Sequence, residues 1–199
     1  MASILDSLNS VLGDNAIGQI SQQLGSDPAA TGSAVSAALP VLISALAQHS
    51  SSQGGADALQ AALQQHDGSV LDDLASHFGG GAATLDSGAA ILGQVLGNRQ
   101  TAVQQTLGQT SGLGSQTTGQ LLAMLAPVVL GALGRHSREQ GLDSSGLAAA
   151  LGSAQAQATA DNAPLGSLVT QLLDSNHDGS VLDDVAKLAG GWLGGGTRT

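Results

Sequence analysis

The stretch DSNHDGSVLDD, at residues 174–184, carries oxygen-bearing side chains at the alternate positions that a calcium loop uses. Loops of the EF-hand type bind the ion through side-chain oxygens at positions 1, 3 and 5. They turn sharply at a glycine in position 6 and add a backbone carbonyl from position 7. Those positions are filled here by Asp174, Asn176, Asp178, Gly179 and Ser180. The spacing therefore predicts a candidate Ca2+ site made of hard oxygen ligands.

The closing position of this loop departs from the calcium pattern. Position 12, where a bidentate carboxylate belongs, is Val185. Asp183 or Asp184 would have to take that role, with the loop ending one turn early. We therefore expect weak binding at best.

Replacing Asp174 by alanine is expected to abolish any rise in melting temperature that calcium produces. A ligand that binds only the folded chain raises its stability, and that gain disappears with the site. The measurement is a thermal melt in calcium and in chelator, for the unsubstituted chain and for the variant. An unchanged calcium response in the variant would rule out this site.

The last eight residues of the loop, HDGSVLDD, occur a second time at residues 66–73. There, Leu63 and Gln65 stand at the first and third loop positions, so two of the three opening ligands are missing. A helix start explains the shared residues without an ion. Ser69 would be the N-cap and Asp72 the third helical residue, a capping box with aspartate in place of glutamate. Calcium binding is then at most an added property of the second copy.

The sequence shows no pattern of an established catalytic type. The chain has no cysteine, which excludes disulfides, thiolate metal sites and cysteine nucleophiles. Its histidines have no HxxxH or HExxH spacing, and no phosphate-binding glycine loop, dinucleotide motif or G-x-S-x-G occurs. We therefore predict that the protein is not an enzyme and has no cofactor beyond the candidate Ca2+. An enzyme of unidentified type stays open as an alternative.

The charge balance limits the choice of partners. The formal net charge is −10, with 15 acidic residues against 5 lysines and arginines. Nucleic acid binding needs a positive footprint, and anionic membranes attract basic segments, so we expect neither partner. Nearly all of the acids are aspartate, which is a better N-cap than interior helix residue. This composition favours caps and turns.

Two apolar runs, at residues 33–47 and 121–134, dominate the hydropathy of the chain. Both are shorter than the ~20 residues that span a bilayer, and each contains a proline. We predict buried core helices and no transmembrane segment, with a membrane hairpin as the alternative. The first residues lack a positive start followed by an apolar run, so they do not resemble a secretory signal. We expect a cytoplasmic location, with other export routes open.

The apolar periodicity is helical throughout. One-sided apolar stripes are formed by Ile4, Leu5, Leu8, Val11 and Leu12, and by Leu92, Leu96, Val103 and Leu107. We predict an all-α fold with about four helices in each half. Pro40 and Pro127 fall inside the apolar runs, where a proline removes a backbone donor and clashes one turn back. Each core helix should therefore kink or restart there.

Two long stretches echo one another at a constant separation. PVLISALAQHSSSQG, at residues 40–54, and PVVLGALGRHSREQG, at residues 127–141, pair His49 with His136 as well as the two prolines. We predict an internal duplication into two related helical units, at residues 1–81 and 85–196. The second unit is longer by an Ala/Gln-rich insertion near residues 152–164, which we expect to be a loop or a short weak helix.

The aromatic residues Phe78 and Trp192 both lie beside glycines near the end of a predicted unit. Aromatic side chains anchor interfaces when exposed, and each could equally pack on its own core. A core of Leu, Val, Ile and Ala buries less area per residue than an aromatic one, so association would add stability. We therefore expect self-association, or binding of another protein, in a structural or assembly role.

The stretch LLDSNHDGSVLDDVAKLAGGWLGG, at residues 172–194, follows a proline-containing apolar helix and resembles the YidB-like bacterial family of uncharacterised proteins. The resemblance covers roughly residues 85–196, and residues 1–81 look like a shortened relative. It implies a small all-α fold likened to homeodomains and no established activity. The chain lacks the basic helix that DNA binding would need, and likeness of fold does not carry function.

Overall fold

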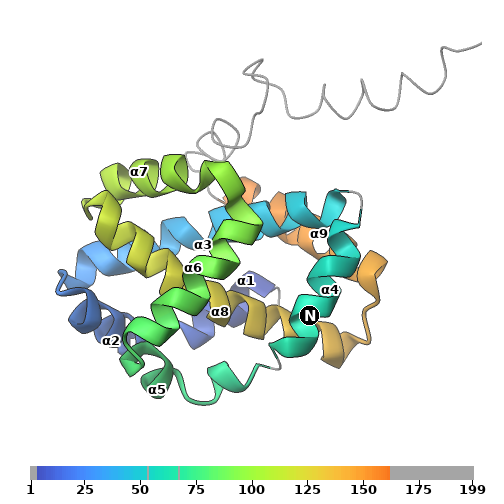
Figure 1. The fold of residues 1–199 in the computed structure, drawn as a ribbon, viewed down its shortest axis with the longest axis horizontal. Helices are drawn as coiled ribbons and strands as arrows, with labels where there is room; N and C mark the ends of the chain where they lie inside the picture. Colours follow the sequence, from blue (N-terminus) through green and yellow to red (C-terminus); the bar gives the residue numbers. More distant parts are fainter. Residues whose placement is uncertain (1–3, 53, 67, 162–199) are drawn as a thin grey trace, which may run out of the picture.

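The computed structural model describes residues 4–52, 54–66 and 68–161, and these form helices joined by short turns and loops (Figure 1). The prediction of an all-α fold is confirmed. In chain order the elements are α1 Ile4–Val11, α2 Asp14–Leu24, α3 Pro28–Ser51, α4 Gly55–Gln65, η1 Ser69–Leu71, α5 Leu74–Gly79, α6 Ala82–Leu96, η2 Gly97–Arg99, α7 Gln100–Ser111, α8 Ser115–Gln140 and α9 Ser144–Asp161.

The two long helices α3 and α8, of 24 and 26 residues, run through the middle of the molecule (Figure 1). By length and composition alone both could cross a membrane, yet 72% and 83% of their most apolar stretches are buried inside the fold. Burial on this scale removes their apolar surface from water, which is the main favourable term in folding. In this structure most of their apolar surface is covered by other helices.

The prolines of the two core helices do not interrupt them. Pro40 lies inside α3 and Pro127 inside α8, both are buried, and each helix continues on either side. A proline inside a helix costs one backbone hydrogen bond. Both helices are long enough to continue past that loss, so neither restarts at its proline.

A single hydrophobic core draws on both halves of the described chain. Leu8, Leu39, Leu92, Leu125 and Leu147 come from five different helices, and each is at most 2% exposed. The predicted stripe in the second half is confirmed, because its leucines and valine are all buried. The two predicted units therefore share one core.

The arrangement of the helices agrees with the predicted repeat at several positions. Helices α2 and α7 each end at a glycine with positive φ, Gly25 and Gly112, and each is followed by a core helix. Both core helices are then followed by another positive-φ glycine, Gly54 and Gly141. These pairs have the same separation as Pro40 and Pro127. The duplication itself stays an interpretation of these correspondences.

Residues 152–161, the described part of the predicted insertion, continue α9 and form no loop. Alanine is the best helix former, and it recurs through this stretch. Ala154 and Ala158 are 4% and 3% exposed. Helix α9 packs mainly against α3 and also against α4. This described part of the insertion therefore joins the core.

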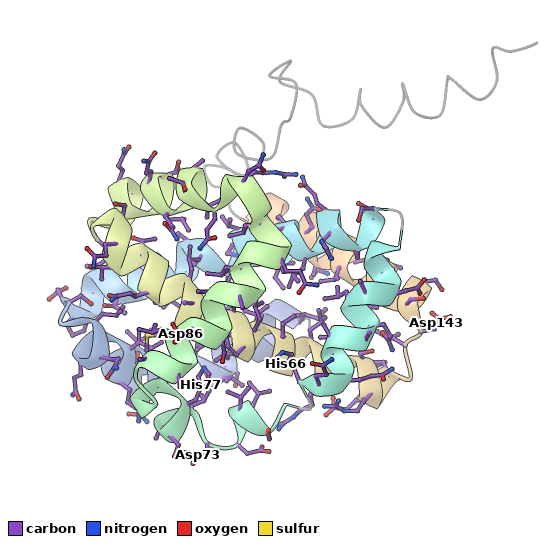
Figure 2. The ribbon with its side chains drawn as sticks, viewed as in Figure 1. His66, Asp73, His77, Asp86 and Asp143 are labelled. Atoms are coloured by element: carbon purple, nitrogen blue, oxygen red, sulfur yellow. The ribbon has the colours of Figure 1, made fainter. Side chains whose placement is uncertain are left out.

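Aspartates cap three of the helices, as the Asp-rich composition predicts. The carboxylate of Asp27 accepts hydrogen bonds from the amides of Ala29 and Ala30, at 2.9 and 3.1 Å. Asp73 and Asp143, labelled in Figure 2, cap α5 and α9 in the same way. The amide of Gly146, 2.7 Å from Asp143, holds the pKa of that carboxyl below its usual range, and the Ser145 hydroxyl adds to the effect.

Candidate functional site

Residues of α4 and α6 form most of the lining of a groove with a volume of about 390 Å3. Both helices are labelled in Figure 1. Ala58, Ala61 and Ala62 line it from α4, and Ile91 and Val95 line it from α6. The leucines of α4 turn into the core, so its alanines face α6. Because an alanine side chain ends at Cβ, these positions leave open the space that larger side chains would fill.

The lining of this groove is mostly apolar and carries no Asp, Glu, Lys or Arg. Leu59 and Leu130, each 3% exposed, lie beneath the alanines. The polar members are two histidines and two glutamines, His49, His66, Gln65 and Gln94. Figure 2 shows His66 where α4 ends. None of these polar side chains is a carboxylate.

A smaller pocket of about 170 Å3 shares His49 and Val95 with this groove. This extension is lined by the C-terminal part of α3 and by the end of α6 with η2. Arg99, an exposed residue, lies in it and donates a hydrogen bond from Nη1 to the side-chain carbonyl of Gln48. A pocket with one positive charge thus adjoins the groove.

The first copy of the repeated octapeptide is held against α8. Gly68 adopts a φ of 82°, which favours glycine, and a Cβ there would lie 3.0 Å from the carbonyl oxygen of Gly131. A Cβ on Gly134 would lie 2.5 Å from the carbonyl oxygen of His66. Arg135 then closes the contact, because its Nη2 donates to the Gly68 carbonyl at 2.9 Å and to the Asp72 carboxylate at 2.7 Å. The octapeptide can pack this closely on α8 because Gly131 and Gly134 leave room for it and Arg135 binds it.

The capping box predicted for this octapeptide is wrong in its position. Ser69 begins a short 3-10 turn, Ser69–Leu71, and the α-helix begins only at Leu74. Asp73 is the N-cap, and its carboxylate accepts from the Ser76 amide at 3.1 Å. Hydrogen bonds from Ser76, chiefly from its side chain, lower the pKa of Asp73. The prediction failed because Asp72 pairs with Arg135, a residue that local sequence does not reveal.

Replacing Arg135 by alanine is expected to lower the free energy of unfolding by about 1–2 kcal/mol, because a charge-assisted bond to the Gly68 carbonyl is lost. Asp72→Ala is expected to cost less than about 1 kcal/mol, because that carboxylate is 70% exposed and exposed ion pairs contribute little. Urea unfolding of both variants shows which substitution lowers the free energy of unfolding more. Equal losses would mean that the ion pair, and not the carbonyl bond, holds the octapeptide.

A third pocket, of about 280 Å3, lies beside Arg135 between α1 and the C-terminal part of α8. It contains His136 and Glu139 from α8 and Ser7 and Ser10 from α1. These polar groups sit around a guanidinium that is already bonded to Gly68 and Asp72. The arrangement therefore holds the octapeptide in place. Within the described ranges, no three His, Asp or Glu side chains gather as a metal-binding group.

The pKa of His77 lies below its usual range. Its side chain is half buried between α5 and α8, and Nε2 lies 3.2 Å from the Met124 carbonyl. Burial disfavours the charged ring and lowers its pKa, although the hydrogen bond to Met124 partly opposes this. Figure 2 shows the ring near α6, and it also packs edge-on against Phe78.

Acidification is expected to destabilise the protein through His77. The folded chain takes up the proton at a lower pH than the unfolded chain, whose histidine has a pKa of about 6.5. The free energy of unfolding therefore falls as pH drops from about 7 through the folded pKa. Urea unfolding at several pH values should show a shallower acid loss for His77→Gln, which keeps a donor for Met124. An identical pH profile in the variant would contradict the assignment.

Most of the site residues predicted from sequence lie outside the described residues. These are the calcium candidates Asp174, Asn176, Asp178, Ser180, Asp183 and Asp184, and the interface candidate Trp192. Phe78, the other interface candidate, is 2% exposed and lies in the core. The α4–α6 groove was not predicted. Its only signal in the sequence is the pair of alanine-rich helices, which also fits ordinary core packing.

Comparison with known families finds one family model that matches most of the chain. A family model described as "Bacterial protein of unknown function (DUF937)" matches residues 6–136 and 142–197. The two matched ranges meet near Gly141, between α8 and α9. No curated protein and no solved structure matches the chain.

Proposed function

The chain belongs to DUF937, a bacterial protein family of unknown function, as its resemblance to uncharacterised YidB-like proteins implies. On that premise we propose that it is a non-enzymatic helical protein that self-associates, and that the α4–α6 groove receives an apolar helix from a second copy. Helix-in-groove binding of this kind places apolar side chains of one helix into an apolar surface groove.

The observation that carries this proposal is a groove lined mostly by Ala, Leu, Ile and Val, with no Asp, Glu, Lys or Arg in its lining. A carboxylate in a water-filled groove stays hydrated and costs nothing. A carboxylate in a groove that binds an apolar helix would be buried without a partner, which is costly. Exposed alanines on α4 also let a partner helix approach closely. The groove therefore has the surface chemistry of a helix-binding site.

Two other functions stay as alternatives. A calcium-binding module would use the loop at residues 174–184, and the Asp174→Ala melt described above tests it. An enzyme of unidentified type would need a converging set of catalytic side chains. The mixed polar pocket beside Arg135 favours neither, because its guanidinium is already engaged by the octapeptide.

The experiment that tests the proposal is the solution mass by light scattering after size exclusion, at several concentrations and with chelator present. We expect a mass above one chain that rises with concentration. A single-chain mass at every concentration would contradict self-association, and a binding partner of another sequence would then be sought for the same groove. Chelator keeps calcium-driven assembly from imitating the result.

A further inference from the structure

The pocket that contains Arg99 combines a positive charge with an apolar lining. This Arg99 pocket is lined by Ala45, Gln48, His49, Ser52, Val95, Leu96 and Arg99. The exposed guanidinium of Arg99 donates one of its five N–H groups to the side-chain carbonyl of Gln48. No carboxylate of the described residues forms an ion pair with it. Its remaining N–H groups can therefore donate to the oxygens of a ligand.

The pocket beside Arg135 is lined by the equivalent positions of the other core helix. The corresponding lining residues of α3 and α8 are Ala45 and Ala132, Gln48 and Arg135, His49 and His136, and Ser52 and Glu139. Each pair has the same separation as Pro40 and Pro127. The opposite walls correspond as well, because Val11 of α1 and Val95 of α6 each begin the sequence Val-Leu-Gly. The same helix face thus lines a pocket twice in this fold.

The pocket on α8 shows what this helix face binds. Nη2 of Arg135 donates to the carboxylate of Asp72 at 2.7 Å and to the carbonyl of Gly68 at 2.9 Å. The position of Arg135 is taken in α3 by Gln48, which binds the guanidinium of Arg99. Both pockets therefore present a guanidinium at this helix position. Its N–H groups match a carboxylate in charge and in geometry.

We infer that the Arg99 pocket binds the carboxylate of a small organic acid. The carboxylate accepts hydrogen bonds from the Arg99 guanidinium, and Gln48 holds that guanidinium in place. The apolar part of the acid packs against Ala45, Val95 and Leu96, of which Ala45 and Leu96 are buried. A volume of about 170 Å3 is below the ~300–1,000 Å3 typical of pockets for drug-sized ligands. The acid is therefore a short one.

The residues of α3 next to the pocket argue against a bound turn like the octapeptide. Gly131 and Gly134 let that turn pack on α8, since a Cβ on Gly134 would lie 2.5 Å from the carbonyl oxygen of His66. The same positions of α3 are Ser44 and Ala47, which carry the Cβ atoms that the two glycines lack. The Arg99 pocket therefore admits a carboxylate, but not the closely packed backbone that brings Asp72 to Arg135.

The test is a titration of the full chain with butyrate, which joins a carboxylate to a short apolar chain. The 1H–15N NMR signals of the Arg99 and Gln48 side chains report binding. Ionic strength is held constant, because salt screens exposed charges. We expect shifts that saturate with a Kd in the millimolar range. Butyramide has nearly the same shape without the charge, and it should bind ~10-fold more weakly or less, because charge-assisted hydrogen bonds are the stronger ones.

Two substitutions test the role of the guanidinium. Arg99→Gln should weaken butyrate binding ~10-fold or more, with the Gln48 amide as the reporter. Gln48→Glu should also weaken it, because the new carboxylate pairs with Arg99 and competes with the ligand. The matched control is Arg138→Gln, which removes the same charge from an exposed position of α8 outside the pocket. Equal affinity in Arg99→Gln and the parent, or equal binding of butyramide and butyrate, would overturn the inference.

A second ligand separates the two sources of a carboxylate, a free acid and a protein side chain. The blocked peptide acetyl-Gly-Asp-Gly-amide carries its carboxylate on a peptide backbone. Weaker binding of this peptide than of butyrate would support a small organic acid. Equal or tighter binding would overturn that assignment in favour of an aspartate of another protein. The titration reads a pocket of the single chain, so its result does not depend on self-association.

Discussion

Replacing Gly88 by alanine is expected to lower the free energy of unfolding by about 3 kcal/mol or more. Gly88 lies where α6 crosses α8, and a Cβ built on it overlaps the backbone of Ala123. Backbone cannot rotate away as a flexible side chain does, so the two helices must separate. Overpacking a core costs about 1–3 kcal/mol, occasionally more, and a clash with backbone belongs to the upper end.

The matched control for this substitution is Gly93→Ala on the same helix. A Cβ at Gly93 meets no atom within 4 Å, and alanine is favoured over glycine in a helix by about 1 kcal/mol. The control should therefore be neutral or stabilising. Thermal melts should separate the two variants clearly, with Gly88→Ala lower than the parent by roughly 6–12 °C for a domain of this size.

A Gly88→Ala protein that melts like the parent would mean that α6 does not lie this close to α8. That result would also affect the groove, because α6 forms one of its walls. The close crossing at Gly88 sets the distance between α6 and α8. The position of α6 opposite α4 across the groove depends on that distance. Stability and the shape of the groove therefore depend on the same glycine.

Replacing Ala61 by glutamate is expected to weaken self-association about 100-fold while leaving the fold intact. Ala61 is exposed on α4 and lines the groove, so the isolated chain keeps the new carboxylate in water. A bound helix would desolvate it without a partner. A penalty of about 3 kcal/mol is in the range for burying an unpaired polar group, and each 1.4 kcal/mol is a factor of ten in the dissociation constant.

Gln64→Glu is the matched control for that variant. Gln64 is exposed on the same helix but does not line the groove, and the substitution adds the same charge. Light scattering across a dilution series should show assembly in the parent and in Gln64→Glu, and single chains in Ala61→Glu. If Ala61→Glu assembles as the parent does, the association surface lies elsewhere on the molecule.

Much of the fold follows from local features of the sequence. The apolar spacing predicted the helices, and Leu8, Leu92 and Val103 are buried as that spacing requires. The abundance of aspartate predicted N-caps, which Asp27, Asp73 and Asp143 provide. These properties depend on residues within one or two turns of each other, so a single sequence contains them.

The register of the octapeptide shows where local reasoning ends. The sequence predicted Ser69 as the N-cap, but Asp73 provides the cap instead, because a distant arginine binds Asp72. Arg135 draws Asp72 and the Gly68 carbonyl to α8, and the α-helix then begins only after Asp73. A contact between residues far apart in the chain outweighed a local preference of about 1 kcal/mol.

By itself, therefore, the sequence determined the all-α class, the buried core helices and the abundance of aspartate caps. Only the tertiary structure decided that α4 and α6 lie on either side of a groove, that Gly88 meets Ala123, and that Arg135 holds the octapeptide. The reason is physical. Periodicity identifies which face of a helix avoids water, whereas the helix that covers that face is chosen by the packing of side chains that lie far apart in the sequence.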